Sequence, residues 1–123
     1  MELPSEWLEF LSLLQRHDAR FVIVGAYALA AHGRPRASQD IDIFIEPSAE
    51  NAARVAKALE DFGYSKLAAE ASEALREPPR MASLGVPPLR IDIMNHIDGV
   101  PFQRAYEGAI EESLGGIDVR FIG

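Results

Sequence analysis

The stretch Asp40-Ile41-Asp42-Ile43-Phe44-Ile45 constrains the fold of this chain most strongly. Polar and apolar residues alternate at its start, which is the period of a strand with one buried and one open face. Asp40 and Asp42 are therefore expected side by side on one face. Two carboxylates so close repel each other and raise each other's pKa unless a cation lies between them. The pattern indicates either a site for a divalent cation with oxygen ligands, best satisfied by Mg²⁺, or the solvated face of an ordinary strand.

A second alternating stretch, residues 89–94, brings a third acid. Arg90 and Asp92 share one face of this expected strand. If it lies beside strand 40–45, Asp92 adds a third carboxylate to the same site. Arg90 would then either pair with the acids or contact a phosphate. The alternative is a plain cross-strand salt bridge, which contributes little at a surface.

Composition limits the classes of protein that this chain can be. Its 123 residues suffice for one domain with a core, and 48% hydrophobic and 25% charged residues are typical of a globular protein. The absence of cysteine excludes disulfides and thiolate metal sites, and fits a cytoplasmic protein. No apolar run is long enough for a membrane span, so we expect no membrane association. The net charge of −7 argues against a surface that clamps nucleic acid as a whole, although a local basic patch remains allowed.

Periodicity and capping residues predict the remaining elements. Helices are expected over residues 5–16, 26–31, 48–62, 70–76 and 102–108, with Ser5 and Ser48 as N-caps. Strands are expected over residues 20–24, 40–45, 89–94, 109–113 and 116–122, with 80–88 as a loop or a short hairpin arm. These elements predict a single α/β domain, in which helices flank a central mixed, twisted sheet of four or five strands. One face of that sheet should be open at the acids.

The junction around Gly25 has the features of a phosphate site. Gly25 lies between a β-branched run and an Ala-rich segment, so it would precede the N-terminus of a helix. Backbone N–H groups there lack partners and bind anions. The following loop carries Arg34 and Arg36, whose guanidinium groups match phosphate oxygens. The alternative is a pair of solvated surface arginines.

Taken together, these motifs resemble the nucleotidyltransferase fold of polymerase-β-like enzymes. The shared elements are Val24-Gly25-Ala26, then Asp40-Ile41-Asp42, and later Asp92 within Arg90-Ile91-Asp92-Ile93. The sequence is most similar to the small prokaryotic nucleotidyltransferase-like proteins related to the toxins of abortive-infection toxin–antitoxin systems. That similarity lies in residues 24–38 and 85–92 and extends over roughly residues 20–122.

The resemblance implies the transfer of a nucleoside monophosphate from a nucleoside triphosphate to an RNA end, a protein side chain or a small molecule. In such enzymes the acids corresponding to Asp40, Asp42 and Asp92 are catalytic and hold two Mg²⁺ ions, and Asp92 would help to deprotonate the attacking hydroxyl. The resemblance assigns nucleotide binding to five residues: Gly25, Ala26, Arg34, Arg36 and Ser38. It further implies a cognate antitoxin or toxin partner.

The sequence departs from the family pattern at two points. Ala26 occupies a position where the wider superfamily often has Gly or Ser, so a hydroxyl contact to phosphate is missing. The sequence also ends at Gly123, whereas members of the group tend to continue into a basic helical stretch. This chain is thus either cut or a minimal version. Besides the active enzyme, two other interpretations stay open: a non-catalytic nucleotide- or partner-binding module with this fold, and a structural α/β domain with acids on its surface.

Overall fold

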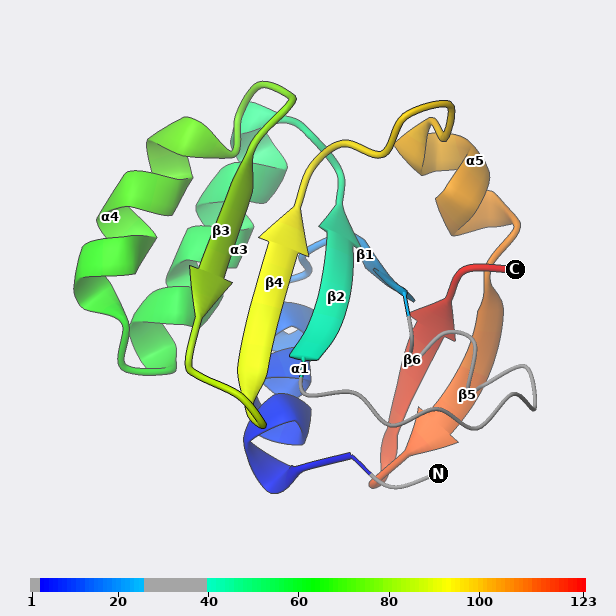
Figure 1. Cartoon of the computed structure of the whole chain (residues 1–123), viewed down its shortest axis with the longest axis horizontal. Coiled ribbons are helices and arrows are strands. Elements are labelled where there is room, and N and C mark those ends of the chain that lie inside the picture. Colours follow the sequence, from blue (N-terminus) through cyan, green and yellow to red (C-terminus); the bar gives the residue numbers. More distant parts are fainter. Residues whose placement is uncertain (1–2, 26–39) are drawn as a thin grey trace.

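The computed structural model describes residues 3–25 and 40–123, and within them one six-stranded mixed sheet runs through the molecule (Figure 1). The described helices are α1 (Ser5–Arg16), α3 (Ala49–Asp61), α4 (Ser65–Ala74) and α5 (Phe102–Glu107). The strands are β1 (Phe21–Val24), β2 (Asp40–Ile45), β3 (Met81–Leu84), β4 (Arg90–Met94), β5 (Ile110–Leu114) and β6 (Ile117–Phe121). They lie in the order β3-β4-β2-β1-β6-β5. The predicted mixed α/β architecture is confirmed, and this sheet is consistent with a nucleotidyltransferase fold.

Alternating side chains divide the sheet into two differently covered faces. On one face, Ile41, Ile43 and Ile45 of β2 join the main core with buried residues of α1, α3 and α4. On the other face, Phe44 packs against Phe102 of α5, with ring centroids 5.2 Å apart. Asp40 and Asp42 alternate with the isoleucines and therefore share the face of Phe44. Figure 1 shows α5 near the end of β2 that is remote from Asp40.

Three sequence predictions are corrected by the structure. The sheet has six described strands rather than four or five, because the segment after α4 forms the edge strand β3. Ser5 is the first residue of α1, follows Pro4 and makes no capping hydrogen bond, whereas Ser48 caps α3 as predicted. Helix α4 begins at Ser65 rather than near residue 70, because its buried alanines pack it along α3. The helix predicted over 26–31 lies outside the described residues.

Two buried asparagines fix the ends of the strands that carry the acids. Asn51 of α3 accepts a hydrogen bond from the Arg20 backbone N–H (2.7 Å) and donates to the carbonyls of Arg20 (3.1 Å) and Glu46 (3.0 Å). Asn95, directly after β4, makes a similar set of bonds to backbone groups of the segment between α4 and β3. Each side chain satisfies backbone groups that would otherwise be buried without partners. They anchor β2 and β4 at the ends opposite the acids.

None of the helices in the described part of the chain combines the length and the apolar composition that crossing a membrane requires.

Candidate active site

Asp40, Asp42 and Asp92 converge on the open face of the sheet, as the sequence predicted. Strands β2 and β4 are parallel neighbours, and their register places Asp42 beside Asp92 and Asp40 beside Arg90. One carboxylate oxygen from each acid lies within 4.8 Å of the others. Two oxygens on one Mg²⁺ ion, each about 2.1 Å from the metal, are at most about 4.2 Å apart. The three acids can therefore hold a divalent ion after small side-chain rotations. No second group of three potential metal ligands converges in this way in residues 3–25 and 40–123.

The carboxyl group of Asp42 is electrostatically strained in the absence of a cation. Its pKa is raised from 3.8 to about 6, chiefly because the carboxyl group is partly buried and, after that, because the charges of Asp40 and Asp92 repel it. A hydrogen bond with Asp92 also raises this pKa, while the charge of Arg90 lowers it. The predicted rise is confirmed for Asp42, but burial contributes more to it than the expected repulsion. A bound cation would favour the charged carboxylate and so gain affinity from this arrangement.

Arg90 supplies the positive charge nearest to the three acids among the described residues. Its Nη2 atom lies 3.2 Å from Asp40 Oδ2 and 3.1 Å from Asp92 Oδ2. A single guanidinium nitrogen thus bridges carboxylates from two strands. The Arg90 Nε atom is buried and has no hydrogen-bond partner. Of the two roles that the sequence left open for Arg90, the structure shows the pairing with acids.

Ser83 contacts the third acid, Asp92, from the neighbouring strand β3, and this contact was not predicted from the sequence. Strand β3 runs antiparallel to β4 and places Ser83 beside Asp92. The Ser83 hydroxyl donates a hydrogen bond of 2.6 Å to Asp92 Oδ1, while Arg90 contacts Oδ2. Asp92 is only 2% exposed, and both of its oxygens are satisfied. The sequence predicted a loop or a short hairpin arm for residues 80–88. Only the hairpin arm would include a strand that could bring Ser83 beside Asp92.

Gly25 lies directly against Asp42. It follows β1, whose last residue Val24 pairs with Asp42, and it adopts φ +76°, in the left-handed region that favours glycine. A Cβ atom at this position would overlap Asp42 Oδ2. The glycine therefore leaves the space that the carboxylate needs. The other residues predicted to bind nucleotide, which are Ala26, Arg34, Arg36 and Ser38, lie outside the described residues.

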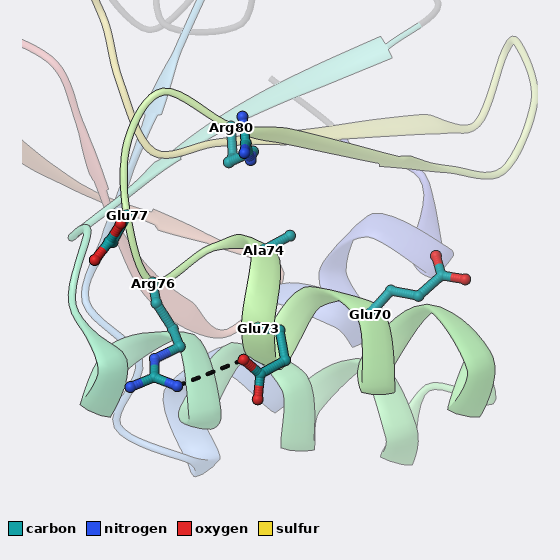
Figure 2. Close-up of a pocket in the computed structure, with 6 residues that line it drawn as sticks. All are labelled: Glu70, Glu73, Ala74, Arg76, Glu77 and Arg80. Atoms are coloured by element: carbon teal, nitrogen blue, oxygen red, sulfur yellow. Dashed lines mark hydrogen bonds and ion pairs between the residues drawn. The ribbon is translucent and has the colours of Figure 1, made fainter.

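A hollow of about 690 Å³ lies away from the three acids and is lined by charged residues of both signs (Figure 2). Its lining comes from α4 and the segment between α4 and β3, and includes three glutamates and two arginines. Arg76 Nη1 lies 3.5 Å from Glu73 Oε2, and Figure 2 marks this ion pair with a dashed line. Such mixed, solvated charges offer no convergent ligand set. The Asp40–Asp42–Asp92 group is therefore the candidate active site.

Comparison with protein families gives the context of this site. Residues 10–111, most of the chain, match the family described as nucleotidyl transferase AbiEii toxin, Type IV TA system. The chain belongs to the AbiEii family. All three acids and Gly25 fall within the matched AbiEii segment. This confirms the predicted resemblance to nucleotidyltransferase-like toxins. Comparisons with curated proteins and with solved structures found no match.

Proposed function

We propose that this AbiEii-family chain is a Mg²⁺-dependent nucleotidyltransferase that acts as the toxin of a toxin–antitoxin pair. It would transfer a nucleoside monophosphate from a nucleoside triphosphate to a hydroxyl group of an RNA, a protein or a small molecule. The observation that carries the proposal is the convergence of Asp40, Asp42 and Asp92 from two parallel strands. Nucleoside triphosphates are cytoplasmic metabolites, so we place the activity in the cytoplasm.

The carboxylates would hold up to two Mg²⁺ ions, and bound Mg²⁺ would neutralise the triphosphate and stabilise charge on the leaving group. The acceptor oxygen forms a bond to the α-phosphorus, the bond from that phosphorus to the bridging oxygen breaks, and pyrophosphate leaves. Asp92 would accept the proton of the attacking hydroxyl. Gly25 and the amide of Ala26 would contact phosphate oxygens. The charges of Arg34 and Arg36, with the Ser38 hydroxyl, would complete the nucleotide site.

A second function, a binding module without catalysis, is favoured by one observation. Arg90 already bridges Asp40 and Asp92, so part of the acidic charge is neutralised without a metal. In such a module the acids would hold the strands or a partner together, and no group would be transferred. The two functions differ in their need for Mg²⁺ and in turnover.

A label-transfer assay separates these functions. The protein is incubated with each of the four nucleoside triphosphates labelled at the α-phosphate, with Mg²⁺, and with RNA or protein extract as acceptor. We expect the label to appear in an acceptor, to disappear with EDTA, and to be lost in Asp42→Asn. The control is Asp118→Asn, which alters an exposed carboxylate on β6. Nucleotide binding without transfer to any acceptor would favour the binding module. Rescue of growth by a co-expressed neighbouring gene product would identify the antitoxin.

A further inference from the structure

Arg90 contacts two of the three acids that could hold a metal ion. We propose that Arg90 is an exchangeable counter-ion, which neutralises Asp40 and Asp92 in the free protein and transfers its hydrogen bonds to the triphosphate when Mg²⁺ and nucleotide bind. The inference rests on the proposed function, and it assigns a role in nucleotide binding to a residue outside the predicted phosphate site.

The position of Arg90 on the sheet fixes where its guanidinium can act. It lies two residues before Asp92 on β4 and directly beside Asp40 on β2, so its side chain shares the face of the acids. Its Nη2 atom donates to Asp40 Oδ2 and Asp92 Oδ2, and these two carboxylates belong to the group that could hold a metal ion. A divalent ion on these oxygens and a guanidinium beside them carry like charges and repel each other. Metal binding therefore weakens the present contacts of Arg90.

Two further observations indicate that the present arrangement of Arg90 is not its only one. Its side chain is 43% exposed, although that of its partner Asp92 is only 3% exposed, so Arg90 has room to rotate while Asp92 is held. The buried Nε atom makes no hydrogen bond, and an unsatisfied buried donor is unfavourable. A triphosphate offers several charged oxygens, which a guanidinium can contact through two nitrogens at once. The triphosphate would thus replace the carboxylate contacts and could satisfy Nε as well.

The proposal predicts opposite effects on two ligands when the guanidinium is removed. In Arg90→Met, Mn²⁺ used as a probe should bind about tenfold more tightly in the absence of nucleotide, because the competing cation is gone. A non-hydrolysable nucleoside triphosphate analogue, with Mg²⁺ present, should bind about tenfold more weakly, because a charge-assisted contact is lost. Electron paramagnetic resonance measures the first affinity and calorimetry the second. The matched control is Arg76→Met, which removes an exposed arginine that pairs with Glu73 beside the hollow shown in Figure 2, away from the acids.

The outcomes distinguish this inference from the proposed function. Unchanged or weaker Mn²⁺ binding in Arg90→Met, or unchanged binding of the analogue, would overturn the proposed exchange. The proposed function would still stand in that case if the wild type binds Mn²⁺ and the analogue. A wild type that binds neither Mn²⁺ nor the analogue would overturn both. If Arg90→Met does not fold, Arg90→Lys serves instead: it keeps the competing charge but lacks the planar fork, so we expect nearly wild-type Mn²⁺ affinity and weaker analogue binding. Equal analogue binding by Arg90→Lys and the wild type would contradict the exchange.

Discussion

Replacing Asp42 by Asn tests the site through stability as well as through activity. Asn has nearly the same shape as Asp but carries no charge. In the metal-free protein, the raised pKa of Asp42, about 6 against 3.8, means that the charged carboxylate is disfavoured by the fold. That difference corresponds to about 3 kcal/mol at neutral pH. Because Asp42 is only partly buried and solvent screens its charge, we expect Asp42→Asn to be about 1–2 kcal/mol more stable at pH 7.

The pH dependence of this gain has a defined sign. The native carboxyl group binds its proton at a higher pH than the unfolded one, so unfolding releases a proton between about pH 4 and pH 6. Wild-type stability is therefore reduced above the folded pKa of Asp42, and the reduction disappears as the pH falls below 3.8. The Asn variant has no such group. The stability difference between the two proteins should be largest at pH 7 and should shrink towards zero near pH 4.

Thermal melts of the wild type, Asp42→Asn and the exposed control Asp118→Asn measure both effects. A gain of about 1–2 kcal/mol should raise the melting temperature by about 3–8 °C for a chain of this size. Mg²⁺ with nucleotide should raise the melting temperature of the wild type and of the control, but much less that of Asp42→Asn. A less stable Asp42→Asn at pH 7 would mean that Asp42 forms a stabilising salt bridge. A full ligand-induced shift in this variant would mean that Asp42 is not a metal ligand.

Three further substitutions test the supports of the site. Gly25→Ala should lower the free energy of unfolding in urea by about 2–4 kcal/mol, more than Gly63→Ala, because both residues have positive φ but only at position 25 would the added Cβ overlap the Asp42 carboxylate. Equal losses would remove the steric role of Gly25. Ser83→Ala should cost about 1–3 kcal/mol and weaken Mn²⁺ binding, because it leaves Asp92 Oδ1 without its donor; unchanged Mn²⁺ affinity would make this bond purely structural. Asn51→Ala should cost about 2–4 kcal/mol in the same unfolding measurement but leave Mn²⁺ affinity unchanged, and a large change in affinity would contradict its placement away from the acids.

The acidic strands could be predicted from the sequence because their signal is local. Both β2 and β4 alternate charged and apolar residues, and that period alone determines which side chains share a face. Their pairing in one sheet followed from the resemblance to nucleotidyltransferases, and the parallel register then brought Asp92 beside Asp42. The fold class and the convergence of the acids were accordingly predictable.

The supports of the acids could not be predicted, because they depend on contacts between distant segments. Strand β3 is four residues long and lies at the edge of the sheet, and its sequence Met-Ala-Ser-Leu has no clear alternation. Only its pairing with β4 brings Ser83 to Asp92. The choice between acid and phosphate as the partner of Arg90 likewise depends on a rotamer and on the ligand state, which no local pattern encodes.

The burial of the third acid decides between two of the interpretations that the sequence left open. Acids that merely decorate a strand should be solvated, but Asp92 is 2% exposed and lies close to two other carboxylates. Burying like charges together is unfavourable, and the guanidinium of Arg90 carries a single positive charge beside three carboxylates. The fold nevertheless holds this group in place with Ser83, and Gly25 leaves room for Asp42. An arrangement that lowers the stability of the free protein but fits a divalent cation is expected of a binding site, so the surface-decoration interpretation does not account for it.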